Sequence, residues 1–326
     1  MKQLLLYIMI VSALSGAVSV VFYWKLNEVS PMRKKLKALD YSMKSHEFNN
    51  IIFIGGSRVV THINPGIIDS ITGLKSQNIS IQDIGIVEYN MLLNKYLQVH
   101  KKPDAVFMNL DVNMFFTSGP LFNINDFIPY LTDTLIYKKL SPYKFAYRSK
   151  PAQYFYFLEK VFATTDYVKS KLFDFKNQIL LNIDTAKIYS NFEPRVAAWS
   201  VGADLELNTP TKATWQQEGF DLLQQVIDRC NKDSVQLVFI YSPFYYKGKT
   251  YITNFDEIFN LIKKIADENN IPFWNYSTLD FCRSNEYFYN YSHMNYMGAK
   301  VYSNLLALDI KKFFLSKNNP KNSGLK

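Results

Sequence analysis

A serine and a histidine at opposite ends of the chain have settings that suit nucleophilic catalysis. Ser57 follows a short apolar run and two glycines in IIFIGGSRVV, residues 51–60. His293 stands in FYNYSHMNYMGAKVYSNLL, residues 288–306, just before a stretch with helical spacing. A histidine that takes the proton of a serine hydroxyl makes that hydroxyl a nucleophile toward an ester carbonyl. The two residues are therefore candidates for a nucleophile and its base, provided that the fold brings them together.

Each residue also has a purely structural interpretation. Gly-Gly-Ser is common in turns, and a histidine before a helix can be a cap or a buried hydrogen-bonding group. The other histidines fit catalysis less well, since His46 lies in a linker, His62 in the turn or rim near Ser57, and His100 at a helix end. Arg58 is interpreted as a solvated surface arginine. The scattered histidines lack the spacing of a metal site, and no cofactor is expected.

The elements that would position the two residues alternate between strands and helices. Apolar runs without a period of two predict buried parallel strands over Ile51–Ile54, Ile79–Ile84, Ala105–Leu110, Val235–Tyr241 and Ile271–Trp274. Apolar residues at helical spacing predict helices over Glu88–Lys101, Glu218–Asn231, Asn254–Asn269 and Gly298–Phe314. We therefore expect a three-layer α/β/α flavodoxin-like sandwich with a central parallel sheet. Ligands bind such sheets at the carboxyl ends of the strands, where Ser57 would lie.

The expected α/β domain covers residues 48–316. Residues 115–215 interrupt its rhythm of strands and helices and are rich in aromatic residues and proline. They predict a mainly helical insertion over one end of the sheet, where it would shape or cover a site. Residues 317–326, KNNPKNSGLK, are expected to form a disordered tail.

The first 25 residues predict a transmembrane anchor. Leu4–Trp24 carries no charge over 21 residues, a length that spans a bilayer as a helix. Small residues within it make cleavage conceivable, but the apolar run continues past them, which favours an uncleaved anchor over 1–25. Residues 26–47 then form a charged amphipathic linker. Its basic residues favour a cytoplasmic domain by the positive-inside rule, whereas the resemblance described below favours an extracytoplasmic one.

Composition favours a globular protein and argues against a nucleic-acid-binding protein or a cysteine-bound metal cluster. The 326 residues are 48% hydrophobic and 20% charged, which suits one large α/β domain with an insertion. The net charge of +9 favours anionic partners, but no nucleic-acid-binding motif occurs, so nucleic acid is not an expected partner. The two cysteines, Cys230 and Cys282, are too few for a metal cluster and form either two buried thiols or one disulfide.

Four segments together resemble the SGNH/GDSL esterase superfamily. FIGGSRV, residues 53–59, is similar to the block that holds the nucleophilic serine, and QDIGIVEYN, residues 82–90, to the block whose glycine donates a backbone N–H. VFMNLDVNMFF, residues 106–116, stands where the third block is expected. NYSHMNYMGAKVYS, residues 290–303, is similar to the last block, Asp-x-x-His followed by Leu-Asn-x-x-Gly. VFIYSPFYY, residues 238–246, resembles membrane-anchored members such as the teichoic-acid D-alanine transfer protein.

The resemblance implies a mechanism and a set of site residues. His293 would take the proton from Ser57 while Ser57 attacks an ester carbonyl. The oxyanion would be held by the backbone N–H groups of Ser57 and Gly85 and by the side-chain amide of Asn113, with Asn109 as the alternative to Asn113.

The position of the catalytic acid departs from the superfamily pattern. Three residues before His293 the superfamily has aspartate, and this chain has Asn290. An asparagine can orient the imidazole or favour the wrong tautomer, and it has no charge with which to stabilise the imidazolium. Three interpretations stay open: a slow Ser–His pair, replacement of the acid by Asp280 or Glu286, or a domain that binds without catalysis. Gly56, in place of the usual Asp or Ser, is a smaller departure.

The resemblance also implies a function. We expect a membrane-anchored, extracytoplasmic serine O-acyl esterase or acyltransferase that acts on a cell-surface glycan or polymer. The alternative is a catalytically impaired scaffold that binds glycan or assists a membrane acyltransferase, and Asn290 is the feature that favours it. A domain that faces the cytoplasm is a third hypothesis.

Overall fold

The computed structural model describes residues 3–7, 10, 14, 41–42, 46–115, 127, 130, 133–140, 192–199 and 210–318. The chain divides into two compact units, residues 1–36 with 123–186 and residues 37–122 with 187–326. The second unit holds an α/β domain. The described part of the first unit includes α6 (Thr134–Leu140), whose Ile136 and Leu140 are buried.

Two of the expected segments lie largely outside the described residues, namely the anchor over 1–25 and the insertion over 115–215. Among the residues that the structure describes, no helix is both long enough and apolar enough to span a bilayer. The described end of the expected linker packs on the domain. The rings of Tyr41 and His100 stack at 5.0 Å, and the two ring nitrogens of His100 bond to the carbonyl oxygens of Tyr41 and Glu47.

Five parallel strands form one sheet in the order β2-β1-β3-β4-β5. They are β1 (Ile51–Ile54), β2 (Ser76–Asn78), β3 (Ala105–Asn109), β4 (Gln236–Tyr241) and β5 (Phe273–Asn275). The expected parallel α/β sheet is confirmed, and its strand order is the flavodoxin-like one. Because the order reverses between β1 and β3, a crevice is expected above the carboxyl ends of these two strands.

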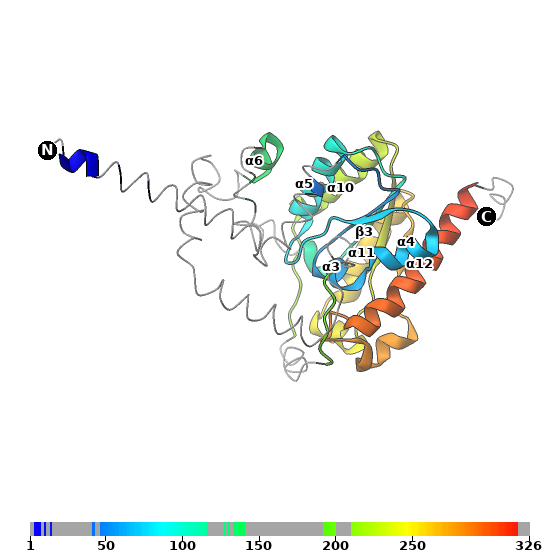
Figure 1. Cartoon of the computed structure of the whole chain (residues 1–326). Coiled ribbons are helices and arrows are strands. Elements are labelled where there is room, and N and C mark those ends of the chain that lie inside the picture. Colours follow the sequence, from blue (N-terminus) through cyan, green and yellow to red (C-terminus); the bar gives the residue numbers. More distant parts are fainter. Residues whose placement is uncertain are drawn as a thin grey trace. The chain divides into compact units, whose positions relative to one another are not determined.

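Helices cover both faces of the sheet (Figure 1). On one face, α4 (Pro65–Thr72) packs against α12 (Tyr296–Asn318), which also contacts α3 (Ser57–His62). On the other face, α5 (Ile86–Val99) packs against α10 (Gln217–Lys232).

Strands β1 to β4 bury both of their faces, as expected of a parallel sheet with helices on either side, whereas the edge strand β5 is only partly buried. Phe53 of β1 and Phe107 of β3 share a buried cluster with Leu306 of α12. Ile240 of β4 belongs to the same cluster, and side chains alternate along a strand, so the next residue, Tyr241, lies on the opposite face. There its ring packs edge-on against Phe255 and Phe259 of α11 (Phe255–Glu268).

The second strand was predicted in the wrong place. The strand is Ser76–Asn78, three polar residues that are nevertheless buried, and not Ile79–Ile84. The side chain of Asn78 donates to the carbonyl of Val59 and accepts the N–H of Ser80, so the polar side chain is satisfied inside the protein. The isoleucines of 79–84 are also buried, but in a loop that includes Asp83 with a φ of 59°. Their apolar character therefore reflects burial and not a strand.

The four predicted helices are confirmed to within a few residues as α5, α10, α11 and α12. α12 runs to Asn318, so Lys317 and Asn318 are helical and not part of a disordered tail, while residues 319–326 lie outside the described part. Cys230 and Cys282 are both buried and free, which settles the question of a disulfide between them.

Candidate active site

Ser57 is the first residue of α3, directly after β1 and the two glycines. Gly55 has no room for a side chain, because a Cβ atom there would overlap Val59 and crowd Asn109 of β3. The missing side chain lets α3 pack closely on the ends of β1 and β3. Ser57 therefore stands at the carboxyl edge of the sheet, near the point where the strand order reverses.

The loop between η7 (Asn285–Tyr287) and α12 brings His293 to Ser57. The Nε2 atom of His293 lies 2.8 Å from the Oγ atom of Ser57. The loop is fixed by backbone bonds, in which Tyr289 donates to the carbonyl of His293 and Asn295 donates to that of Tyr287. The structure thus brings together the two residues that the sequence singled out.

Asn290 sets the tautomer of His293. Its Oδ1 atom accepts the backbone N–H groups of Ser292 at 3.1 Å and of His293 at 2.8 Å. Two N–H donors require an acceptor, which identifies this atom as the amide oxygen. The same oxygen lies 3.1 Å from Nδ1 of the His293 ring, so the contact is a hydrogen bond when Nδ1 carries the proton, and we assign the proton to Nδ1. Nε2 is then the acceptor for the Ser57 hydroxyl, which is the tautomer that a general base requires.

No carboxylate takes the place of the missing acid among the described residues. The contacts of Nδ1 of His293 are the side chains of Asn290 and Ser292, at 3.1 and 3.0 Å. Asp280 lies in η6 (Asp280–Arg283) and Glu286 in η7, and neither side chain contacts the imidazole. The suggestion that one of them replaces the acid is therefore not supported by the geometry.

Electrostatics around His293 disfavour its charged form. Burial lowers the pKa of His293 to about 4, and the positive charges of Arg195 and Arg58 contribute in the same direction. The neutral imidazole that accepts a proton is therefore the stable form at neutral pH. It is also a weak base, because burial and the two arginines disfavour the imidazolium.

His62 supports the loop that carries His293. It is fully buried at the end of α3, and not in the turn or rim that the sequence predicted. Its Nε2 atom accepts the backbone N–H of Met294 at 2.9 Å, and its ring lies edge-on to that of His293, with centroids 6.3 Å apart. Burial lowers the pKa of His62 well below its ordinary value, so the ring stays neutral and can accept this bond. Its position five residues after Ser57, in the same short helix, was the available signal.

Arg58 is buried, which contradicts the interpretation as a solvated surface residue. Its guanidinium bonds to the carboxylate of Asp111 and to the carbonyl oxygens of Ser242 and Pro243. It also lies over the ring of Tyr241, 4.5 Å from its centroid. These contacts tie the start of α3 to the ends of β3 and β4. Arg58 therefore has the contacts of a structural ion pair beneath the site.

The expected oxyanion donors are only partly in place. The N–H of Gly85 donates to Oε2 of Glu88 at 3.1 Å, as part of the cap of α5, so it is engaged in this structure. Asn113 lies in η1 (Val112–Phe115), and its side chain is outside the described part. Asn109, the alternative, is buried at the end of β3, where its Oδ1 accepts from Ser242 while its Nδ2 has no partner within the described part of the chain. The N–H of Ser57 opens α3 and has no acceptor within that helix.

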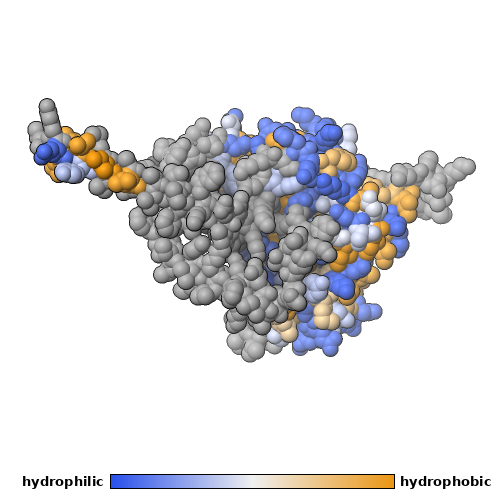
Figure 2. All heavy atoms as spheres, viewed as in Figure 1, coloured by the Kyte–Doolittle hydropathy of each residue, from blue (hydrophilic) through white to orange (hydrophobic). Residues whose placement is uncertain are grey.

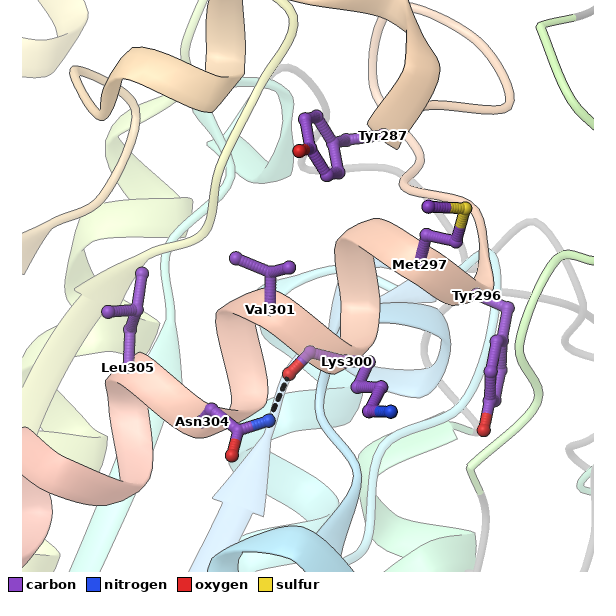
Figure 3. Close-up of a pocket in the computed structure, with 7 residues that line it drawn as sticks. All are labelled: Tyr287, Tyr296, Met297, Lys300, Val301, Asn304 and Leu305. Carbon is purple, nitrogen blue, oxygen red and sulfur yellow. Dashed lines mark hydrogen bonds between the residues drawn. The ribbon is translucent and has the colours of Figure 1, made fainter.

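An open pocket of about 610 Å³ lies beside α12 (Figure 3). Tyr287 faces Val301 across it in the close-up, and the remaining lining residues are Tyr296, Met297, Lys300, Asn304 and Leu305. Hydrophobic residues gather on the surface where α12 lies (Figure 2). Neither Ser57 nor His293 lines this pocket, so it is separate from the catalytic geometry.

In comparisons with known proteins, the similarities found are to solved structures. No protein-family model and no curated sequence matches it. A Streptococcus pneumonia protein provisionally described as a platelet activating factor is 13% identical, with a TM-score of 0.43 over 91% of this chain and 98% of that one. A provisionally assigned acylhydrolase from Bacteroides fragilis is 12% identical, with a TM-score of 0.40 over 87% and 97%.

A third solved structure is a GDSL-like lipase from Bacteroides thetaiotaomicron. It is 11% identical, with a TM-score of 0.39 over 86% of this chain and 98% of that one. None of the three is described as a D-alanine transfer protein.

Proposed function

We propose that the α/β domain is a serine O-acyl esterase or acyltransferase of the SGNH type. The contact that carries this proposal is the 2.8 Å approach of His293 Nε2 to Ser57 Oγ, in a tautomer that Asn290 fixes. A serine and a base within hydrogen-bond distance, with the base oriented by a third group, are the signature of an activated nucleophile.

The reaction follows from this geometry. Oγ of Ser57 attacks the ester carbonyl while Nε2 of His293 takes the hydroxyl proton. The imidazolium then gives that proton to the oxygen of the departing alcohol, which leaves the acyl group on Ser57. A water molecule or an acceptor hydroxyl next attacks the acyl group, with His293 again as the base, and Ser57 is restored. Asn290 orients the ring throughout but adds no charge.

The setting of the reaction is also part of the proposal. The uncharged run Leu4–Trp24 supports a single membrane anchor, and the resemblance to cell-surface proteins supports an extracytoplasmic domain that acts on a glycan or polymer. A C-terminal reporter that is active only outside the cytoplasm tests the orientation. Activity of that reporter is expected, and inactivity would favour the cytoplasmic alternative.

A second candidate is a scaffold that has lost catalysis and binds glycan or assists a membrane acyltransferase. The neutral Asn290, the low pKa of His293 and the engaged N–H of Gly85 favour it. A serine-directed fluorophosphonate probe separates the two candidates. The esterase predicts labelling that is lost in Ser57→Ala, whereas the scaffold predicts no labelling of Ser57.

A further inference from the structure

A short segment, residues 192–199, lies within the expected insertion and contacts the candidate active site. Glu193 donates its backbone N–H to the carbonyl of Val60 at 2.9 Å, in the helix that begins with Ser57. Two residues later, Arg195 accepts the N–H of Tyr296 at 2.7 Å and pairs with Asn295 in a β-bridge. The segment therefore connects the helix of the nucleophile with the end of the loop that carries the base, where Arg195 pairs with Asn295, two residues after His293.

The guanidinium of Arg195 is only partly satisfied. Its Nη2 donates to Oε1 of Gln82 at 3.2 Å, and its buried Nε has no hydrogen-bond partner among the residues that the structure describes. The amide of Gln82 is itself held by Glu193, at 2.7 Å, which leaves its oxygen turned toward the arginine. A guanidinium has five N–H donors, so most of the donors of Arg195 are without an acceptor among the described residues.

The two arginines near His293 differ in their environment. Arg58 is buried and neutralised by the carboxylate of Asp111. Arg195 is partly exposed, and in the described part of the chain it forms no ion pair with a carboxylate. Among the described residues its guanidinium bonds to a neutral amide, and it lies 5.9 Å from the centroid of the Tyr289 ring. An uncompensated cation with free donors is suited to bind an anionic oxygen group.

We propose that Arg195 binds an anionic group, a carboxylate or a phosphate, on the ester that Ser57 attacks. This inference rests on the proposed function and adds to it the charge class of the substrate. Arg195 pairs with Asn295 at the end of the loop that carries His293, and its charge acts on the imidazole, so the proposal places the anion of a bound ester near the guanidinium. Planar N–H pairs on arginine match both carboxylate and phosphate oxygens.

The proposal also accounts for an arrangement that otherwise works against catalysis. The charge of Arg195 opposes protonation of His293, and this weakens the base. An anion bound to Arg195 would offset that charge and strengthen the base in the substrate complex. Substrates with an anionic group would therefore gain in turnover as well as in binding.

The test compares three acetyl esters in the full-length protein: 4-acetoxybenzoate, its neutral methyl ester, and 4-acetoxyphenyl phosphate. Arg195→Gln is expected to lower kcat/KM for the anionic esters relative to the neutral one by about tenfold or more, because a charged hydrogen-bonding partner is lost. Arg195→Lys keeps the charge and should lose less. Arg283→Gln removes the same charge from an exposed position in η6 and should leave the ratio unchanged.

The carboxylate and phosphate arms show which anion is preferred. An unchanged ratio in Arg195→Gln for both anionic esters would overturn the inference. Equal losses for all three esters would also overturn it, because they would indicate a purely structural role.

A binding measurement separates this inference from the proposed function. In the Ser57→Ala background, 4-acetoxybenzoate should raise the pKa of His293, followed by NMR of its ring, and Arg195→Gln should abolish that rise. If wild type hydrolyses no ester but the rise occurs, the esterase proposal fails while anion binding by Arg195 stands. If wild type hydrolyses the esters but the pKa of His293 is insensitive to the anion, the anion-binding inference fails.

Discussion

Asn290→Asp should convert a weak base into a strong one. The aspartate oxygen would keep the two backbone N–H bonds that hold Asn290 and would place a negative charge about 3.1 Å from Nδ1 of His293. An opposite charge at that distance stabilises the imidazolium. The shape of the side chain is conserved, so the change tests charge alone.

The size of the effect follows from the environment of His293. Returning its pKa from about 4 to the ordinary 6.5 corresponds to about 3 kcal/mol in favour of the imidazolium. If most of the proton has moved from Ser57 to His293 in the transition state, most of this free energy lowers the barrier, and kcat should rise roughly 100-fold. The reverse exchange in the serine-protease template lowers kcat about 10⁴-fold, which sets an upper bound.

The assay is the hydrolysis of 4-nitrophenyl acetate between pH 4 and 9, with Ser57→Ala as the blank. The acid limb of the pH profile of kcat/KM should shift to higher pH. Its midpoint should move from about 4, the pKa of His293 in the wild type, to near or above 6.5 in Asn290→Asp. Asn290→Ala, which removes the acceptor without adding charge, should be slower than wild type. If a correctly folded Asn290→Asp protein showed neither a faster rate nor a shifted limb, the role given to position 290 would be refuted.

Three further predictions concern residues around the site. His62→Ala leaves the N–H of Met294 without its acceptor, so kcat for 4-nitrophenyl acetate should fall about tenfold or more while His62→Gln retains part of it; equal activity in the two variants would count against a positioning role. Glu88→Gln should flatten the pH dependence of stability. Burial raises the pKa of Glu88 to about 8 from 4.5, so the folded state holds a proton that the unfolded state releases, and stability falls as pH rises between these values. Urea unfolding at pH 5 and 8 measures this dependence. The free energy of unfolding of Glu88→Gln, relative to wild type, should rise more at pH 8 than at pH 5; an equal change at the two pH values would contradict the prediction. Gly298→Ala should cost roughly 1–3 kcal/mol, because a Cβ atom would overlap the carbonyl oxygen of Tyr287; an unchanged urea midpoint would show that α12 can shift freely.

The sequence predicted those parts of the site that depend on topology. Ser57 follows a central strand and His293 precedes the last helix. In a parallel α/β sheet both positions fall at the carboxyl edge, so their approach at 2.8 Å could be anticipated. The tautomer of His293 could not, because it depends on two backbone N–H groups that point at one oxygen of Asn290.

The errors have a common physical origin in polar groups that are satisfied inside the protein. β2 consists of Ser76–Asn78, whose polar side chains favour a loop until Asn78 finds its partners in Val59 and Ser80. Arg58 would be on the surface but for Asp111, which lies 53 residues away in the sequence. Such pairings are set by tertiary structure and leave no local pattern in the chain.

The most direct test of the account is to find where the acyl group goes. The protein is mixed with 4-nitrophenyl acetate, quenched in acid within the first turnovers, and digested for mass spectrometry. The account predicts an acetyl group on the peptide that contains Ser57, absent in Ser57→Ala and strongly reduced in His293→Ala. Hydrolysis without acetyl-Ser57, or acetylation of Ser57 that is indifferent to the loss of His293, would contradict it.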